Sequence, residues 1–483
     1  MNKRLILNAL GKILMIAAGA MMLCLTVSLY YSDGDAMAFV KTIALTLLFA
    51  LPMWLLSKPK DMNMRPREAV VAVAGTWVLI SIFGCLPFMF SGLIQDFPSA
   101  FFECVSGFTT TGATVLTGFP ERDFRGVFFW RSFTHWIGGM GILVLTLAIL
   151  PTMSGRTSHL VQAESPGPSL SKLVPKMGDT AKLLYLIYTV LTAALIVLLV
   201  IAGMDWYDAL IHAFGTAGTG GFSNHATSIG HFQSPLIDGI ITVFMLVFGA
   251  NFAVYYKIVA SSWKEAVRSE ELKIYLIIAG VSTLLMAFNI LPMFGNFFQA
   301  IRYSGFQMAS IMSTTGYATT DFNLWPQFSR TMIVLLMFIG ACAGSTAGGL
   351  KVVRAILLGK MSMRLVGQTF RPRKVQVVRF EGKAMDEDML SQVAVLFFAY
   401  IALLLVGTLL ISLDNLYNFE TNFTAALTCI SNVGPGLGEV GPTGSFSGYS
   451  SFSKIVLSVI MLAGRLELFP ILVLFHPAVW KRQ

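Results

Sequence analysis

Charged residues are scarce in this chain. Asp, Glu, Lys and Arg make up only 12% of its 483 residues, whereas 55% are hydrophobic. Soluble globular domains carry about 25% charged residues, so the composition indicates a membrane protein. The net charge of +9 would suit nucleic acid, but the cationic residues lie in loops between apolar segments, where they indicate membrane topology instead. No nucleic-acid partner is expected.

Disulfide frameworks, metal-ligand spacings and catalytic motifs are also missing. The five cysteines fall in or beside apolar segments without the spacing of a metal site. Neither G-x-S-x-G nor H-E-x-x-H occurs, and His135 and His212, which lie in apolar stretches, are expected to be hydrogen-bonded core residues. The segment Gly436–Gly441 matches G-x-G-x-x-G, but Pro442 follows it instead of a helix, which excludes a dinucleotide site. No enzymatic activity and no organic cofactor is expected.

Long apolar segments are abundant. About 20 apolar residues cross a bilayer, and ten segments satisfy that rule: 8–31, 37–57, 69–91, 127–151, 183–203, 235–257, 273–295, 330–358, 390–412 and 454–478. Four shorter apolar stretches, 98–109, 206–217, 300–312 and 418–430, suit re-entrant helices that enter half of the membrane. The predicted fold is an all-α polytopic membrane protein. An N-terminal pair of spans (1–60) precedes four units of span, short helix, loop and span (61–155, 156–260, 261–375 and 376–483).

Each short apolar stretch runs into a polar loop with a glycine, and this pattern occurs four times. The loops align on Gly112, Gly221, Gly316 and Gly434. Six residues before each glycine stands a small residue (Ser106, Gly215, Ser310 and Thr428), and two residues before it a side chain with a polar oxygen (Thr110, Thr219, Thr314 and Asn432). Irregular backbone at membrane depth is tolerated only where protein buries it or where it lines a water-filled path. The pattern therefore predicts four loops at one pathway.

A ring of such loops suits the dehydration of a cation. Backbone carbonyls can replace the water shell of an alkali ion, glycine admits the backbone conformations that turn them inward, and the partly negative end of a short helix favours cations. The expected filter residues are Thr110, Thr111, Gly112 and Ala113; Thr219, Gly220, Gly221 and Phe222; Thr314, Thr315, Gly316 and Tyr317; and Asn432, Val433, Gly434 and Pro435. Packing of helices through small residues is the alternative, and it explains one copy more readily than four.

The distribution of Lys and Arg predicts the orientation. They concentrate in the loops on the side of the N-terminus, which places both termini in the cytoplasm. Arg122, Arg125 and Arg131 lie on the outer side and are partly offset by Glu121 and Asp123. Inverted repeats need an odd number of crossings, but each unit here crosses twice. The four units therefore point the same way around a central pseudo-fourfold pore, with their loops at its outer mouth.

The glycine-rich run 340–349 interrupts the eighth span. Each glycine costs a helix interior about 1 kcal/mol relative to alanine, so the run would unwind readily; small-xxx-small packing through Gly340, Gly344 and Gly348 is the alternative. Arg465 lies at the centre of the last span, where a charge costs about 3 kcal/mol. It faces either the pore, as part of a gate, or an acidic partner other than Glu467, because residues two apart point to different sides of a helix.

The chain resembles the Trk/Ktr/HKT superfamily of cation transporters and is most similar to the bacterial TrkH type. The resemblance is carried by Thr109–Thr114, Gly220–Ser223, Asn432–Gly436 and Gly464–Glu467, together with the extra N-terminal pair of spans. It extends over essentially the whole chain. It implies the pore-forming subunit of a K+ uptake system in the bacterial inner membrane, a homodimer, and a cytosolic nucleotide-binding ring resembling TrkA that controls opening.

The resemblance also implies a gate and an ion preference. Similar proteins carry an intramembrane loop beneath the filter that obstructs the pore, which here assigns the gate to Gly344, Ser345, Thr346, Gly348, Gly349 and Arg465. A serine in place of the first filter glycine accompanies Na+ permeation in the family, so glycine at all four places favours K+ as the transported ion. The alternatives are a Na+-permeable or Na+-coupled transporter of the same family and, from a different class, a polytopic membrane enzyme.

Charged residues outside the filter and the gate have expected roles of their own. Glu103 and Asp208 either raise the cation concentration at the outer mouth or stabilise the short helices. Lys351 and Arg354, just past the glycine-rich run, are expected to mark the cytoplasmic exit. The basic loop 359–389 is either solvated or binds anionic membrane lipid or the cytosolic ring.

Overall fold

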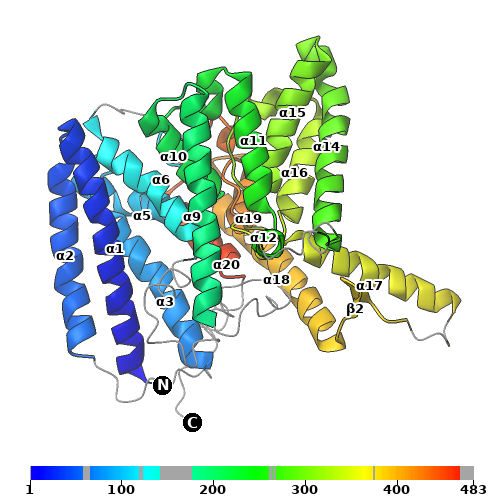
Figure 1. Cartoon of the computed structure of the whole chain (residues 1–483), viewed down its shortest axis with the longest axis horizontal. Helices are drawn as coiled ribbons and strands as arrows, with labels where there is room; N and C mark the ends of the chain where they lie inside the picture. The colour runs from blue at the N-terminus through cyan, green and yellow to red at the C-terminus, as the bar shows by residue number, and fades with distance from the viewer. Residues whose placement is uncertain are drawn as a thin grey trace.

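The computed structural model describes residues 2–57, 66–118, 123–141, 177–259, 264, 268–371, 373 and 376–467. Within them the secondary structure is almost entirely helical, as expected. The strands of the described part, β1 (Arg379–Phe380) and β2 (Lys383–Ala384), form one short antiparallel hairpin. Figure 1 shows the helices side by side in one bundle, with the N-terminal pair at its left edge and α17 (Val352–Phe370) extending away at the right.

The N-terminal pair consists of α1 (Lys3–Tyr31) and α2 (Ala36–Leu55), which pack along each other. Gly11 permits this close approach, because a Cβ at that position would lie 2.9 Å from the carbonyl oxygen of Ala50. The turn between the two helices also anchors the first repeat. Asp33 and Asp35 accept hydrogen bonds from the backbone N–H groups at the start of α6 (Arg125–Gly139). Asp33 also pairs with Arg125 at 3.5 Å, which accounts for one cation on the outer side.

Six helical segments are long and apolar enough to cross a membrane among the described residues, or up to seven if one bent pair counts as a single span. The six are α1, α2, α3 (Pro66–Gly84) with α4 (Leu86–Phe90), α9 (Met177–Ile201), α14 (Glu270–Phe294) and α18 (Glu387–Ser412). They agree with predicted spans to within a few residues. Their outer sides are rich in exposed apolar side chains such as Leu198, Leu285 and Leu409, as lipid contact requires.

The four predicted short helices are present. They are α5 (Phe97–Phe108), α10 (Trp206–Ala217), α15 (Phe297–Met312) and α19 (Phe419–Ser431). Each begins at an Asp or Asn whose side chain accepts a hydrogen bond from a backbone N–H of the first turn: Asp96, Asp205, Asn296 and Asn418. Such N-caps stabilise a helix by about 1 kcal/mol. The four starts are therefore fixed by the same device.

The second span of each unit is shorter than predicted. The helices are α6 (Arg125–Gly139), α11 (Pro235–Gly249), α16 (Gln327–Ile339) and α20 (Ser451–Arg465), and a glycine ends or directly follows three of them. The segment 235–257 is not one straight helix, since α12 (Phe252–Val259) turns 94° from α11. The segment 330–358 is interrupted by nonhelical residues before α17 (Val352–Phe370). The predicted residues 142–151 and 468–478 lie outside the described part.

Short 3-10 helices follow three of the glycine loops: η3 (Ser228–Phe232), η4 (Phe322–Leu324) and η5 (Gly438–Val440). The core lies between the short helices and the second spans of the units, where Phe102, Trp130, Phe248, Met337 and Met461 are at most 1% exposed. This packing holds the ends of α5, α10, α15 and α19 close to one another.

Candidate functional site

The four glycine loops share one backbone conformation. The residue two before each glycine has a positive φ of 54° to 59° (Thr110, Thr219, Thr314 and Asn432), a left-handed conformation that is uncommon for non-glycine residues. The glycines follow with φ of 81°, 76°, 83° and 106° (Gly112, Gly221, Gly316 and Gly434). Four segments that are far apart in the sequence thus have the same order of backbone conformations. The repeated sequence pattern corresponds to a repeated structure.

The repeated residues are the ends of helices. Each short helix closes with a Schellman motif, in which a left-handed residue lets two backbone N–H groups bond back to the last turn. In the first loop Thr111 N donates to Ser106 O at 2.9 Å and Thr110 N donates to Gly107 O at 3.1 Å. The same pair of bonds occurs in the other three loops. The small residue that precedes each glycine by six is therefore the acceptor of the motif, and the polar residue is its left-handed position.

The four loops form a closed ring. A Cβ added to each glycine would collide with a carbonyl oxygen of the next loop: Gly112 with Gly220 at 1.9 Å, Gly221 with Thr315 at 1.9 Å, Gly316 with Val433 at 2.1 Å, and Gly434 with Thr111 at 2.7 Å. Each of these carbonyls belongs to the residue just before the next glycine. The loops therefore surround one axis in the order of the sequence, and no side chain fits between them.

Aromatic side chains of the loops pack behind the ring. Phe222 and Tyr317 are 1% and 0% exposed. The Tyr317 hydroxyl donates to the carbonyl oxygens of His212 and Phe222 at 3.2 and 3.3 Å, which ties the third loop to the second. Asn432 ties the fourth loop to the first, since its Nδ2 donates to Thr111 Oγ1 at 2.9 Å. The side chains of the loops thus hold the backbone. The carbonyls of Phe222 and Tyr317 already accept side-chain hydrogen bonds, whereas those of Thr111, Gly220, Thr315 and Val433 lie at the contacts between loops.

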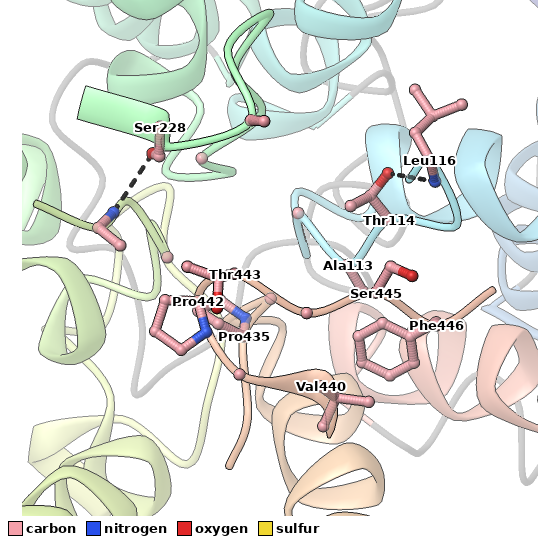
Figure 2. A pocket seen from close by; sticks show the side chains of 18 of the residues that line it. Ala113, Thr114, Leu116, Ser228, Pro435, Val440, Pro442, Thr443, Ser445 and Phe446 are labelled. Atoms are coloured by element: carbon pink, nitrogen blue, oxygen red, sulfur yellow. Dashed lines mark hydrogen bonds between the residues drawn. The ribbon is translucent and has the colours of Figure 1, made fainter. Parts of the chain in front are cut away.

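A cavity of about 390 Å³ opens above the ring and is lined by all four glycines. Figure 2 shows Ala113 and Thr114 of the first loop on one side, and Pro435, Pro442 and Thr443 on the other. The rest of the cavity wall is formed by the segments that follow the second and fourth loops, 223–228 and 439–448. The four loops therefore share one water-accessible mouth.

The glycine-rich run is an irregular segment directly beneath the ring. It is not helical, which excludes the helix-packing alternative, and Gly340, Gly344 and Gly349 have positive φ. Gly348 N donates to Thr314 Oγ1 at 2.9 Å, so the segment contacts the third filter loop. Its other side is held by Glu271, whose Oε1 accepts from Ala343 N at 2.6 Å.

Arg465 bonds to three backbone carbonyls of two distant segments. Its guanidinium donates to Thr346 O at 2.7 Å, to Gly138 O at 2.5 Å and to Gly139 O at 2.9 Å. It therefore connects the irregular segment with the end of α6 on the other side of the pathway. Glu467, which we excluded as its partner within the helix, pairs with Arg354 instead.

The remaining charged and imidazole groups are mostly buried. Lys351 and Arg354 are 2% and 6% exposed and bond within the irregular segment and to Glu467, so they hold this segment rather than extend from an open exit. His135 and His212 are hydrogen-bonded core residues as expected, with Nδ1 of His135 2.7 Å from Gly107 O. Asp208 accepts from Asn224 Nδ2 at 2.7 Å beside the second loop.

Glu103 has no access to the outer mouth, because it is 0% exposed. Its Oε1 lies 2.6 Å from Nε of Arg131, which is itself 2% exposed. This excludes the interpretation that Glu103 concentrates cations from solution. Arg131, one of the cations on the outer side, is therefore paired with an acid of its own repeat. This pair could not be predicted from the sequence, because its members lie on different helices.

Comparison with known proteins agrees with this geometry. The family model described as "TrkH: Cation transport protein" matches residues 35–482. The chain is 36% identical over 489 residues to the Trk system potassium uptake protein TrkH of Escherichia coli (strain K12), covering 100% of both chains. It is 31% identical over 486 residues to the Trk system potassium uptake protein TrkG of the same strain, covering 99% of each.

Among solved structures, the crystal structure of the potassium transporter TrkH from Vibrio parahaemolyticus is similar over 100% of both chains, with a TM-score of 0.89 and 32% identity. The match therefore extends over the whole bundle. The chain belongs to the TrkH family of cation transport proteins.

Proposed function

We propose that this chain is the pore-forming subunit of a bacterial K+ uptake system. The observation that carries the proposal is the closed ring of four loops, in which each filter glycine faces a carbonyl of the next loop. Relatives at 36% and 31% identity are named potassium uptake proteins. The four repeats (61–155, 156–260, 261–375 and 376–483) each contribute one loop to the filter.

A K+ ion would enter the outer cavity and lose water to the ring. The backbone carbonyls of Thr111, Gly220, Thr315 and Val433 would replace part of its hydration shell. The C-terminal ends of four helices lie at the loops and carry partial negative charge, which favours a cation there. The glycines are needed because any Cβ would displace a neighbouring carbonyl.

The irregular segment and Arg465 would form the gate. The segment lies beneath the ring and contacts it through Thr314. Arg465 fastens the segment to the end of α6 with hydrogen bonds that a cationic donor strengthens. Opening would require these bonds to break, so that Gly344, Ser345, Thr346, Gly348 and Gly349 leave the pathway.

The proposed assembly is a homodimer in the bacterial inner membrane, with both termini in the cytoplasm and a cytosolic nucleotide-binding ring resembling TrkA. The Trk system named for the relatives supports partners of this kind. On the predicted cytoplasmic side, Arg364 and Lys360 of α17 pair with Glu387 and Glu270, so part of the charge of the basic loop is already neutralised within the chain.

Ion flux through the purified chain tests the function. In liposomes that contain the chain, we expect K+ and Rb+ to move at least about tenfold faster than Na+ and Li+, a difference of about 1.4 kcal/mol in favour of K+. Equal Na+ and K+ flux would contradict a K+ filter and favour the Na+-permeable alternative. Empty liposomes and liposomes with heat-denatured protein provide the background.

Replacement of Thr314 with valine is expected to raise the resting K+ flux. The change leaves the buried N–H of Gly348 without its acceptor, which costs about 1–3 kcal/mol and destabilises the contact of the irregular segment with the ring. We expect at least about a fivefold increase in flux without the cytosolic partner. Thr219→Val is the matched control, because Thr219 occupies the same place in the second loop but donates only to Gly218 O. An equal effect of both changes would show that the loops, not the gate, are responsible.

A further inference from the structure

A buried ion pair lies beside the filter, outside the ring itself. Glu103 comes from α5, the short helix of the first repeat, and Arg131 comes from α6, the second span of the same repeat. The two side chains are 0% and 2% exposed, and Nε of Arg131 lies 2.6 Å from Oε1 of Glu103. A charge buried at membrane depth is costly unless it is paired. Burying these two charges therefore costs considerable desolvation free energy, which their mutual attraction and hydrogen bonds must offset.

The carboxylate of Glu103 holds the first filter loop. Its Oε1 accepts a hydrogen bond from Thr114 Oγ1 at 2.8 Å, and its Oε2 accepts from the backbone N–H of Val115 at 2.8 Å. These residues come directly after Ala113. Glu103 thus fixes the outer end of the loop that carries Gly112, while the Schellman motif fixes the inner end.

The guanidinium of Arg131 holds the second filter loop. Its Nη1 donates to Ser223 O at 2.8 Å, and its Cζ lies 3.5 Å from the centroid of the Phe222 ring. Phe222 and Ser223 directly follow Gly221. The pair thus joins the outer ends of two adjacent loops, and these are the loops between which Gly112 faces the carbonyl of Gly220.

The third and fourth repeats are joined, after their glycine loops, through neutral groups of η4 and η5. Asn323 donates to Gly438 O at 3.0 Å and accepts from Gly438 N at 3.0 Å. The junction of the first two loops is different in kind, because its groups are charged and Arg131 also borders the outer cavity. A change in this junction would alter both the spacing of two carbonyls and the local charge.

We propose that Glu103 and Arg131 are positioning residues that determine ion specificity by fixing the distance between the first and second filter loops. This inference rests on the proposed function of the ring as a K+ filter. Selectivity between K+ and Na+ depends on the size of the carbonyl cage and on the number and field of its oxygens. Displacement of two of the four loops changes both.

Removing either charge is expected to have the same effect on the selectivity between Rb+ and Na+. The effects of the two removals on the total flux are expected to be opposite. Glu103→Gln removes the negative charge beside Arg131, which borders the cavity, and is expected to slow the entry of every cation. Arg131→Met leaves an anion there and is expected to retain cations near the mouth. Both changes release a loop, so both are expected to lower the ratio of Rb+ to Na+ flux by at least about tenfold, or about 1.4 kcal/mol.

The experiment compares Rb+ and Na+ uptake into liposomes by the unchanged chain, Glu103→Gln, Arg131→Met and Arg131→Lys, each confirmed as a single species by size-exclusion chromatography. Arg131→Lys keeps the charge and is expected to retain most of the selectivity. Asp238→Asn is the matched control, since Asp238 is 2% exposed and pairs with Arg302 at 2.7 Å between α11 and α15. We expect it to leave the flux ratio within about twofold, since it lies in a different junction.

Unchanged ratios of Rb+ to Na+ flux in folded Glu103→Gln and Arg131→Met would overturn this inference and leave the proposed function intact. An equal loss of selectivity in Asp238→Asn would also overturn it, because the effect would then be general destabilisation. If the unchanged chain shows no preference for Rb+ over Na+, the proposed function fails and this inference with it. If Arg131→Met does not fold, Glu103→Gln, which preserves the shape of the side chain, decides between these outcomes.

Discussion

Replacing Gly112 with serine is expected to remove most of the preference for K+ over Na+. The Cβ of the serine would lie 1.9 Å from the carbonyl oxygen of Gly220, far closer than two nonbonded atoms can approach. The φ of 81° at this position is also strained for any L residue. The first and second loops must then move apart, and two carbonyls leave their places. We expect the ratio of Rb+ to Na+ flux in liposomes to fall at least about tenfold.

Gly118→Ser is the control for this prediction. Gly118 follows the same loop, and a Cβ there would meet no atom within 4 Å. It is expected to leave the flux ratio and the rate unchanged. An undiminished preference for K+ in Gly112→Ser would show that the contact between the loops does not set selectivity, whatever the total rate.

The second large effect is expected from Arg465→Ala, which should raise the resting K+ flux without the cytosolic partner. The change removes the hydrogen bonds to Thr346 O and to the carbonyls of Gly138 and Gly139. Hydrogen bonds from a charged donor contribute about 1.5–3 kcal/mol each, so the closed arrangement loses much of its advantage. An increase of at least about tenfold in flux is expected.

Two further variants separate the gate from general destabilisation. Arg465→Lys keeps the cation but loses the planar fork that bonds two carbonyls at once, so we expect an intermediate flux. Arg330→Ala breaks the pair between α16 and Glu420 and is expected to leave the resting flux unchanged. The gate assignment is wrong if folded Arg465→Ala is as silent as the unchanged chain, or if Arg330→Ala is equally active.

The short helices and the four loops were predictable from the sequence because local signals specify them. A stretch of 12 to 16 residues is too short to cross a bilayer, and a recurring glycine shows where the backbone must turn. The role of the residue two before each glycine was not predictable. We expected its side-chain oxygen to matter, but in the structure it is first of all the left-handed residue of a Schellman motif.

The second spans show where hydropathy fails. The segment 330–358 has the composition of one membrane helix, and only its glycines indicate a break. In the structure the break is stabilised by bonds from distant parts of the chain, such as Ala343 N to Glu271 and Arg465 to Thr346 O. The pair of Glu103 with Arg131 is also a tertiary contact between two helices. No pattern within one segment contains this information.

The most direct test of the central claim is to replace the filter glycines one at a time with serine and measure the ratio of Rb+ to Na+ flux in liposomes. If the four loops form one ring, Gly112→Ser, Gly221→Ser, Gly316→Ser and Gly434→Ser each lower the ratio, because every glycine faces a carbonyl of the next loop. An unchanged ratio in any of the four folded variants would contradict the account, since that loop would then stand outside the filter.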